Sequence, residues 1–250
     1  MEVICIIETQ KYKIEKLIWD TNFFNINCAK IILKEEIDKE DIKKINQYIK
    51  RDKIQFLTIQ NNNNNEINNI VIRNMKNIYL ADVNIQFIKN VNKDHNSFIE
   101  NYIKISNNVE EDNNILEIAK SAFIYSRFLR DTRLKNGNQV YKEWAKSAFN
   151  RKDKFFCYYN TNNKTEGFII FSVDKVNSCI IIELMAIEKE YRNKGIGTNL
   201  IKKLENYALK ENINYIKVGT QLNNIEAQNF YIKNNFKHYQ NNSIYHLIKS

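Results

Sequence analysis

The stretch Arg192-Asn193-Lys194-Gly195-Ile196-Gly197-Thr198 decides the fold because of its position in the chain. It follows the apolar run 179–186, which is typical of a buried strand, and it opens a series of apolar residues at helical spacing. Two residues without side chains leave the backbone N–H groups at the start of that helix open to an anion. The stretch therefore predicts a phosphate-binding turn between a strand and a helix.

Two common phosphate-binding motifs do not fit this stretch. A Walker A loop needs Lys and then Ser or Thr after the second glycine, and here Thr198 follows directly. A full dinucleotide fingerprint needs a third glycine where this chain has Leu200. A tight turn with no ligand would also use Gly195 and Gly197. The residues on either side of the stretch are therefore needed to identify the class of ligand.

The elements around the turn follow a regular order. Apolar residues at helical spacing predict helices over 112–123, 138–149, 196–209 and 225–233. Apolar runs predict strands over 155–159, 167–173, 179–186 and 215–221, and a closing hairpin of 236–240 and 243–248 around Asn241-Asn242. The order ααβββαβαββ predicts an α/β fold with a mixed sheet and a crossover helix. The glycine turn then lies where a central strand ends, which is where ligands bind in such folds.

The first hundred residues predict a smaller α/β unit. Strands are expected over 29–33, 54–60 and 78–88, and a helix over 38–51. The run 61–65 predicts a polar loop, and the polar segment 89–108 predicts the connection to the second half. We therefore expect a small N-terminal domain over 1–105, contributing to the acceptor site, and a larger domain over 106–250.

Composition limits the classes of protein to consider. The chain has 250 residues, of which 43% are hydrophobic, so it is long enough to bury a sizeable core. Its net charge of +9 accompanies a high content of Asn, Lys and Ile, so biased codon usage explains the charge as well as a polyanionic partner does. No apolar run reaches the roughly 18 residues of a membrane span. We expect neither a nucleic-acid partner nor a membrane partner.

Cysteine spacing bears on metals and on the cellular compartment. Cys5, Cys28, Cys157 and Cys179 lie far apart, with no pair at the short spacing of a zinc site. They predict free, buried thiols, as in a reducing cytoplasm. We expect a cytoplasmic protein without a metal.

The residues after the glycine turn resemble a known family. Asn224, Ala227 and Phe230-Tyr231 precede Phe236, which gives Asn-x-x-Ala-x-x-Phe-Tyr before a Phe. Together with the apolar strand and Arg-x-x-Gly-x-Gly, this order resembles the GNAT superfamily of acetyl-CoA-dependent N-acetyltransferases, from about residue 110 to the end. The resemblance implies a GNAT fold preceded by a smaller α/β domain, and acetyl-CoA as the cosubstrate.

The resemblance also implies roles for particular residues. The backbone of Met185, Ala186 and Ile187 would pair with the pantetheine arm, Asn224 would contact the CoA arm, and Tyr231 would be the general acid. The amides that would hold the CoA pyrophosphate are those of Arg192, Asn193, Lys194, Gly195, Ile196, Gly197 and Thr198.

Chemistry supports the role of the tyrosine independently, because a phenol can protonate the thiolate that acetyl transfer expels. Structural alternatives stay open. Tyr231 could belong to the core, and Asn224 could cap the helix that follows it. The sequence departs from the family pattern at Asn193 and at Asn235, where glycine is usual. Asn tolerates the left-handed conformation that a helix C-terminus requires, so we expect Asn235 to have little effect on function.

A narrower resemblance concerns the acceptor. The stretches 17–24, Ser126-Arg127-Phe128 with Asp131, 141–144 and 219–221 resemble the dTDP-fucosamine acetyltransferase branch of the superfamily, over nearly the whole chain. Members of this branch acetylate the 4-amino group of a dTDP-linked 4-amino-4,6-dideoxyhexose, for use in surface polysaccharides. The resemblance thus implies a nucleotide-linked amino sugar as the partner, with Ser126 and its neighbours near the acceptor.

Several side chains have the chemistry for such an acceptor. Arg127 can pair with a diphosphate, and Tyr141 or Trp144 can stack on a pyrimidine or sugar face. Glu183 is a candidate base, directly or through water. The alternatives are a surface ion pair for Arg127, a core anchor for Trp144 and an exposed strand carboxylate for Glu183. The base is left unassigned. The default expectation for His238 and His246 is an exposed or capping role.

We therefore expect an N-acetyltransferase of nucleotide-linked amino sugars. One alternative keeps the fold and makes the acceptor a protein N-terminus or a lysine. Another is a non-catalytic module that binds acyl-CoA or nucleic acid. The sequence leaves open the sugar, the nucleotide carrier, a longer acyl donor and the oligomeric state, for which a homodimer is one option.

Overall fold

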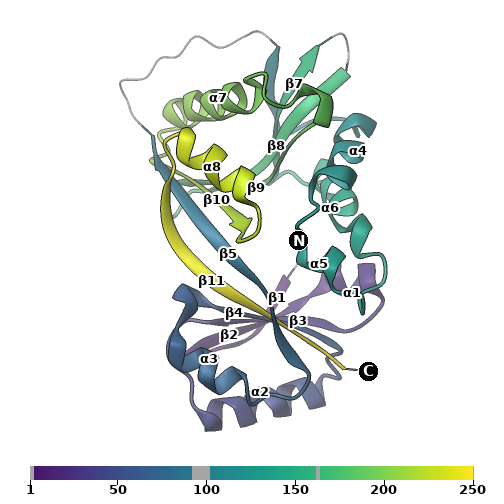
Figure 1. The fold of residues 1–250 in the computed structure, drawn as a ribbon, viewed down its shortest axis with the longest axis vertical. Helices are drawn as coiled ribbons and strands as arrows, with labels where there is room; N and C mark the ends of the chain where they lie inside the picture. Colours follow the sequence, from purple (N-terminus) through teal and green to yellow (C-terminus); the bar gives the residue numbers. More distant parts are fainter. Residues whose placement is uncertain (1–2, 92–101, 162–163, 250) are drawn as a thin grey trace.

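One sheet of eleven strands runs through the protein (Figure 1). The computed structural model describes residues 3–91, 102–161 and 164–249. The first half contains β1 (Val3–Glu8), β2 (Tyr12–Leu17), α1 (Ile18–Phe24), β3 (Cys28–Leu33), α2 (Lys39–Arg51), β4 (Phe56–Asn61), α3 (Glu66–Ile72) and β5 (Ile78–Asn90). The second half contains β6 (Ile103–Ser106), α4 (Asn113–Ala122), α5 (Arg127–Arg130), α6 (Val140–Phe149), β7 (Phe155–Thr161), β8 (Lys164–Asp174), β9 (Cys179–Ile187), α7 (Ile196–Lys210), β10 (Tyr215–Gln221), α8 (Ile225–Lys233) and β11 (Lys237–Ile248).

The strand order of the sheet repeats one topology twice. The order is β1-β2-β3-β4-β11-β5-β10-β9-β8-β7-β6. In the first half β1, β2 and β3 are antiparallel, and β3 pairs in parallel with β4 after the crossover helix α2. In the second half β7, β8 and β9 are antiparallel, and β9 pairs in parallel with β10 after α7. Each unit then ends with a helix and a strand, which are α3 and β5 in the first half and α8 and β11 in the second.

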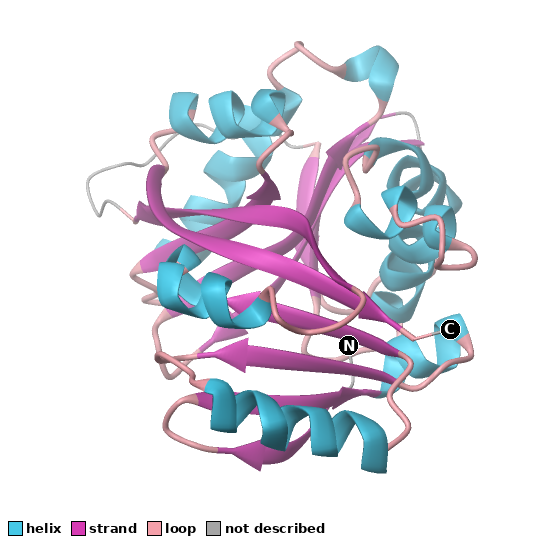
Figure 2. Ribbon diagram, turned by 60° about the horizontal axis from the view of Figure 1, so that its bottom comes forward, coloured by secondary structure: helices cyan, strands magenta, loops and turns pink. Residues whose placement is uncertain are grey.

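The two units exchange their last strands. β5, which ends the first unit, pairs with β10 of the second, and β11 pairs with β4 of the first. β5 and β11 also pair with each other at the centre of the sheet, where they lie side by side in Figure 1. Figure 2 shows the strands as one twisted sheet with helices packed against it. Hydrogen bonds of the sheet join the two halves, so the sheet does not mark a domain boundary. The boundary expected near residue 105 stays a prediction.

The hairpin predicted at Asn241-Asn242 is wrong. Residues 237–248 form the single strand β11, which pairs with β5 along most of its length and with β4 in its second part. Neither asparagine has the positive φ that a two-residue hairpin turn requires. The Asn242 side chain is buried and accepts a hydrogen bond from the Asn63 backbone at 3.2 Å. The register between β11 and β5 shifts twice, once with the extra residue on β11 and once with it on β5, and β11 forms no turn.

The other predicted elements are confirmed, with ends that differ by a few residues. The sequence did not predict β1, β2, α1, α3 or α5 as elements. β6 lies within the segment 89–108, which was expected to be a polar connection, and residues 92–101 of that segment lie outside the described residues. The predicted mixed α/β fold class is correct.

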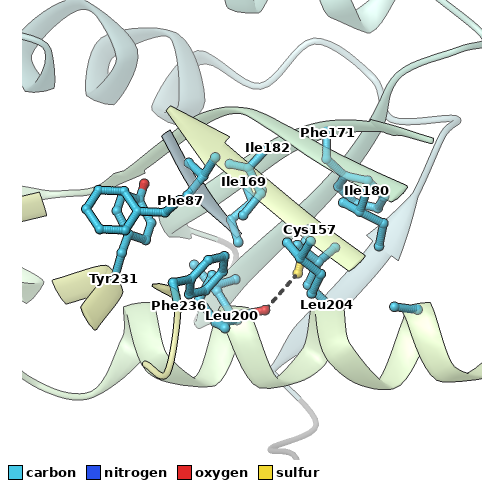
Figure 3. Close-up of a cluster of buried hydrophobic side chains, with 14 of the residues drawn as sticks. Phe87, Cys157, Ile169, Phe171, Ile180, Ile182, Leu200, Leu204, Tyr231 and Phe236 are labelled. Carbon is cyan, nitrogen blue, oxygen red and sulfur yellow. Dashed lines mark hydrogen bonds between the residues drawn. The ribbon is translucent and has the colours of Figure 1, made fainter. Parts of the chain in front are cut away.

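The second unit buries a large apolar core between its strands and α7 (Figure 3). Leu200 and Leu204 of α7 are fully buried against strand residues such as Ile169. The thiols of Cys28, Cys157 and Cys179 are free and buried, as predicted, and Cys5 lies outside the described side chains. This core fixes α7, and with it the glycine turn, against the end of β9.

Candidate active site

The sheet opens between β9 and β10. The two strands pair only from Tyr215 opposite Cys179 to Val218 opposite Ile182. Beyond this point β9 continues to Ile187 and β10 to Gln221, and they do not pair with each other. On their other sides they remain paired with β8 and β5. Backbone groups of Met185, Ala186 and Ile187 that face β10 are thus free of strand partners, as a backbone-pairing ligand requires.

A β-bulge lies at the start of this opening. Ile170 of β8 pairs with Leu184 and the next residue, Phe171, pairs with Ile182, so Glu183 is the extra residue of β9. A bulge bends its strand and redirects the side chain of the extra residue. The Glu183 carboxylate lines a cavity below the opening and forms a hydrogen-bonded ion pair with the buried Lys154. The Glu183 carboxylate is therefore already paired with the Lys154 ammonium group.

The glycine turn presents an uncapped helix end. Gly195 has φ +83°, and α7 begins at the next residue with no side chain capping its first amides. Arg192 donates from Nε to the Ile187 carbonyl at 3.1 Å, which ties the turn to the end of β9. A Cβ on Gly197 would lie 3.0 Å from the Phe230 ring, so this glycine lets α8 approach α7 closely. Free N–H groups at the N-terminus of a long helix are suited to bind a phosphate.

A cavity of about 220 Å³ lies below the opening and joins three parts of the chain. Its lining residues are Leu17, Trp19, Asp20, Lys30, Thr58 and Asn84 from the first unit, Phe123, Arg127, Phe128, Val140, Tyr141 and Trp144 from the α4–α6 segment, and Ile182, Glu183, Leu184, Met185, Val218, Gly219, Thr220, Gln221, Asn224, Ala227 and Tyr231 from the second unit. Most residues singled out for the acceptor therefore surround one space.

Aromatic rings form one wall of this cavity. Tyr141 stacks on Phe123 at a centroid distance of 4.3 Å, and Trp144 stacks on Tyr141 at 5.8 Å, with interplanar angles of 20° and 18°. Trp19 from the first unit stacks on Phe23 at 5.1 Å. Flat aromatic faces of this kind pack against sugar rings and bases.

Charged groups occupy another part of the wall. Asp20 of α1 is 3% exposed, and burial raises its pKa to about 6. Lys30 of β3 has its pKa lowered to about 8 by burial. Arg127 contacts the Phe128 ring with its guanidinium, 4.3 Å from the centroid, and its Nε is buried without a hydrogen-bond partner in the described part of the chain. The cavity thus offers both an anion and cations to a ligand.

Tyr231 connects the cavity to the core. It belongs to α8, is 6% exposed, and packs against Phe87 and Phe236 (Figure 3). It also contacts the Phe230 ring. Burial raises the pKa of its phenol well above the usual value. The phenol therefore stays protonated at neutral pH and can donate a proton or a hydrogen bond.

Some expected site residues have structural roles as well. Ser126 is buried, lies outside the cavity wall and caps α5, with Oγ accepting from the Phe128 amide at 3.2 Å. Asn224 lines the cavity and caps α8, with Oδ1 accepting from the Ala227 amide at 3.1 Å. Ala186, Ile187 and residues 192–198 lie at the opening and the turn, outside the cavity wall.

The expected exposed or capping role of His246 is wrong. This side chain is fully buried, and its Nδ1 lies 3.0 Å from Asp131 Oδ2. The same carboxylate accepts from the Tyr79 hydroxyl at 2.6 Å and from Arg133 at 2.9 and 3.0 Å. The single strand β11 carries His246 through the centre of the sheet, whereas a terminal hairpin would have left it at the edge. Because Asp131 directly follows α5, this network also fixes the helix that bears Arg127.

Sequence reasoning missed Lys30, Thr58 and Asn84 as cavity residues. They belong to β3, β4 and β5, and only the sheet order brings these strands beside the second unit. One signal was available for Lys30, which is the single charged residue of the otherwise apolar strand 28–33.

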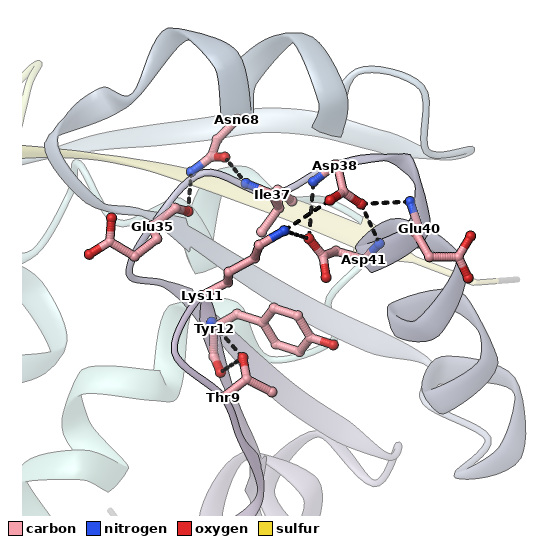
Figure 4. Close-up of polar contacts among 9 residues, drawn as sticks. All are labelled: Thr9, Lys11, Tyr12, Glu35, Ile37, Asp38, Glu40, Asp41 and Asn68. Atoms are coloured by element: carbon pink, nitrogen blue, oxygen red, sulfur yellow. Dashed lines mark hydrogen bonds and ion pairs between the residues drawn. The ribbon is translucent and has the colours of Figure 1, made fainter.

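The first unit has no opening equivalent to that between β9 and β10. β3 and β4 pair along their whole length, from Cys28 opposite Phe56 to Leu33 opposite Asn61. The start of α2 is already capped, because Asp38 accepts hydrogen bonds from the amides of Glu40 and Asp41 (Figure 4).

Lys11 binds both Asp38 and Asp41, at 2.9 and 2.8 Å, so the acidic cluster has its own cation (Figure 4). A phosphate at this position would meet carboxylates in place of free amides. The geometry for a phosphate is therefore found in the second unit.

Comparison with known proteins agrees with this architecture. Residues 114–236 match the profile of the acetyltransferase (GNAT) family. This part of the chain is a GNAT-family domain. The matching profile is that of an acyltransferase family.

Two curated relatives match part of the chain. The spore coat polysaccharide biosynthesis protein SpsD of Bacillus subtilis is 25% identical over 135 residues, which cover 53% of this chain and 46% of SpsD. An uncharacterized N-acetyltransferase of Methanocaldococcus jannaschii is 37% identical over 84 residues, which cover 32% of this chain and 53% of the relative. The chain therefore spans about half the length of the curated relatives it matches.

A solved structure of similar fold extends over the whole chain. A functionally unknown conserved protein from Staphylococcus epidermidis superposes with a TM-score of 0.67 at 14% identity, covering 100% of this chain and 95% of its own. At this identity the likeness shows the fold alone. Within the described residues, no helix has the length and apolarity to cross a membrane, and no group of three or more His, Cys, Asp or Glu could hold a metal ion.

Proposed function

We propose that this protein is an acetyl-CoA-dependent N-acetyltransferase whose acceptor is a nucleotide-linked amino sugar. The specific acceptor that we propose is the 4-amino group of a dTDP-linked 4-amino-4,6-dideoxyhexose destined for surface polysaccharide. The observation that carries the proposal is the single cavity that joins the opened strands and Tyr231 to an aromatic wall and to Arg127. The partial likeness to SpsD, a spore coat polysaccharide biosynthesis protein, supports the same substrate class.

The proposed reaction is direct transfer. The neutral amine attacks the thioester carbonyl carbon, the C–S bond breaks, and the thiolate of CoA leaves. Amides of α7 hold the pyrophosphate, and free N–H groups at the opened end of β9 stabilise the oxyanion as it forms. Tyr231 donates its proton to the thiolate. The amine loses its proton to water or to a base, for which Glu183 is the nearest candidate on β9 although Lys154 engages it.

The cavity favours a small acceptor over a peptide. Residues from both units and from α4–α6 surround it, whereas a protein N-terminus or a lysine would need an open groove. To test this, the protein is incubated with acetyl-CoA and a panel of dTDP- and UDP-linked amino sugars, and the free CoA thiol is followed. Turnover with a dTDP-linked 4-amino sugar is expected. Acetyl-CoA binding without turnover of any sugar would overturn the proposal, and turnover of peptides alone would favour the alternative.

The role of Tyr231 is tested in the same assay. Tyr231→Phe removes only the hydroxyl, so kcat is expected to fall by about 100-fold while acetyl-CoA affinity is kept. Tyr207→Phe is the matched control, because burial also raises the pKa of Tyr207 but the residue lies outside the cavity wall. Equal losses of turnover and acetyl-CoA affinity would exclude Tyr231 as the acid.

A further inference from the structure

The cavity contains a buried carboxylate that the proposed acetyl transfer does not use. Asp20 is 3% exposed and lines the cavity, and its Oδ2 atom is buried with no hydrogen-bond partner in the described part of the chain. An unsatisfied polar atom in the interior has lost its hydrogen bonds to water without replacement, which is destabilising. Asp20 lies on the cavity wall, so a ligand that moves this side chain toward itself can supply the missing donor.

Two cations lie near Asp20 without binding it. The charges of Arg127 and Lys30 both favour the ionised carboxylate, yet neither residue forms an ion pair with it in the part of the chain that the structure describes. Burial opposes the charge on Asp20 and on Lys30, and their pKa values of about 6 and about 8 leave both mainly charged at pH 7. The wall thus keeps a carboxylate and two cations apart, which leaves room for a ligand with both a donor and an anionic group.

We propose that Asp20 determines acceptor specificity by accepting a hydrogen bond from an N–H or O–H donor of the acceptor, next to an anionic group held by Arg127. This inference rests on the proposed function. A nucleotide-linked sugar carries such donors in two places: the imide N–H of thymine or uracil, and the hydroxyls of the sugar. Cytosine has a lone pair where thymine and uracil have the imide N–H, so it cannot donate to a carboxylate there.

Asp82 of β5 provides a matched comparison. Its Oδ2 is also buried without a partner, burial raises its pKa to about 6, and Arg127 is again the cation that acts on it most. Unlike Asp20, it does not line the cavity. Asp82 therefore shares the electrostatic surroundings of Asp20 but lacks its access to a ligand, and Asp82→Asn controls for a general change of charge near Arg127.

The test measures the binding of dTDP, UDP and CDP to the wild type, Asp20→Asn and Asp82→Asn by calorimetry, and kcat/KM with the dTDP-linked amino sugar. If the donor is the imide, Asp20→Asn weakens dTDP and UDP about 10- to 100-fold and reduces their preference over CDP, because Asn can donate to cytosine. If the donor is a sugar hydroxyl, nucleotide binding is kept and kcat/KM falls by the same factor. Asp82→Asn is expected to change neither quantity.

A folded Asp20→Asn variant that keeps wild-type nucleotide binding and kcat/KM overturns the inference, as does an equal loss in Asp82→Asn. Circular dichroism and acetyl-CoA affinity report whether the variant is folded, and Asp20→Ser replaces it if it is not. A wild type that binds no nucleotide and acetylates no sugar contradicts the proposed function instead. The two failures are thus distinguishable.

Discussion

Several ionisable residues of this protein are buried, and His246 is the clearest case. It has no exposed surface, and burial lowers its pKa to about 4 although Asp131 binds its ring. Hydrogen bonds from His246, Arg133 and Tyr79 hold the pKa of Asp131 far below its usual range, against the effect of burial. The pair is therefore a neutral imidazole beside a carboxylate. It joins β11 to the segment that carries Arg127.

The buried histidine predicts a loss of stability in mild acid. Between pH 6.5 and about 4 the unfolded chain protonates His246 and the folded chain does not, so its contribution falls as the pH falls. From pH 7.5 to 5 this amounts to about 2 kcal/mol. Asp20 and Asp82, whose pKa values are raised to about 6, act in the opposite direction. The measured quantity must therefore be a difference between two proteins.

Urea unfolding of the wild type and of His246→Phe at pH 7.5 and 5 isolates this contribution. The wild type is expected to lose about 2 kcal/mol more than the variant over this range. His238→Gln, at an exposed position of the same strand, is the control for removing a histidine outside the buried pair. Equal pH dependence of the wild type and His246→Phe would show that His246 titrates normally in the folded protein.

Site residues were predictable from the sequence where they belong to a short motif or to the apolar face of a helix. Tyr231, Tyr141 and Trp144 stand at such positions, and they line the cavity. Thr58 and Asn84 were not predictable, because their places depend on which strands lie side by side. An exchange of strands between two units leaves no trace in local periodicity.

At the scale of elements, the glycine turn shows why short-range signals work where they do. The strand β9, the turn and α7 follow one another directly in the chain. The apolar run of the strand, the left-handed Gly195 and the apolar face of the helix therefore all predict the same strand–turn–helix structure. The strand β11 shows the opposite case. Its two asparagines favour a turn locally, but pairing with both β5 and β4 stabilises the extended strand, so tertiary contacts override the local preference.

The turn itself gives a prediction about backbone conformation. A Cβ on Gly195 would meet no atom within 4 Å, so the cost of a side chain there comes from its φ of +83° alone. Gly195→Ala is expected to lower the free energy of unfolding by about 1 kcal/mol. Gly195→Asn should cost less, because Asn tolerates left-handed conformations. Denaturant unfolding of both variants measures the difference, and equal losses would mean that the strain does not arise from φ.

At the scale of the whole molecule, two units of one topology have different roles. The second unit has the opened strands and the uncapped helix α7, whereas the first has fully paired strands and a helix start capped by Asp38. The first unit supplies Trp19, Asp20 and Lys30 to the cavity of the second. Under the proposed function, the second unit holds the acetyl donor and the first unit completes the wall around the acceptor.

This division predicts one acetyl-CoA per chain in spite of the repeated topology. Calorimetric titration should give a stoichiometry near one. Thr198→Glu, which places a carboxylate in the first turn of α7, is expected to abolish this binding by repulsion of the pyrophosphate. Asp38→Asn should leave the stoichiometry at one, because the full pairing of β3 with β4 leaves no opening for the pantetheine arm. Two equivalents bound by the wild type, or one equivalent retained by Thr198→Glu, would place the donor site elsewhere.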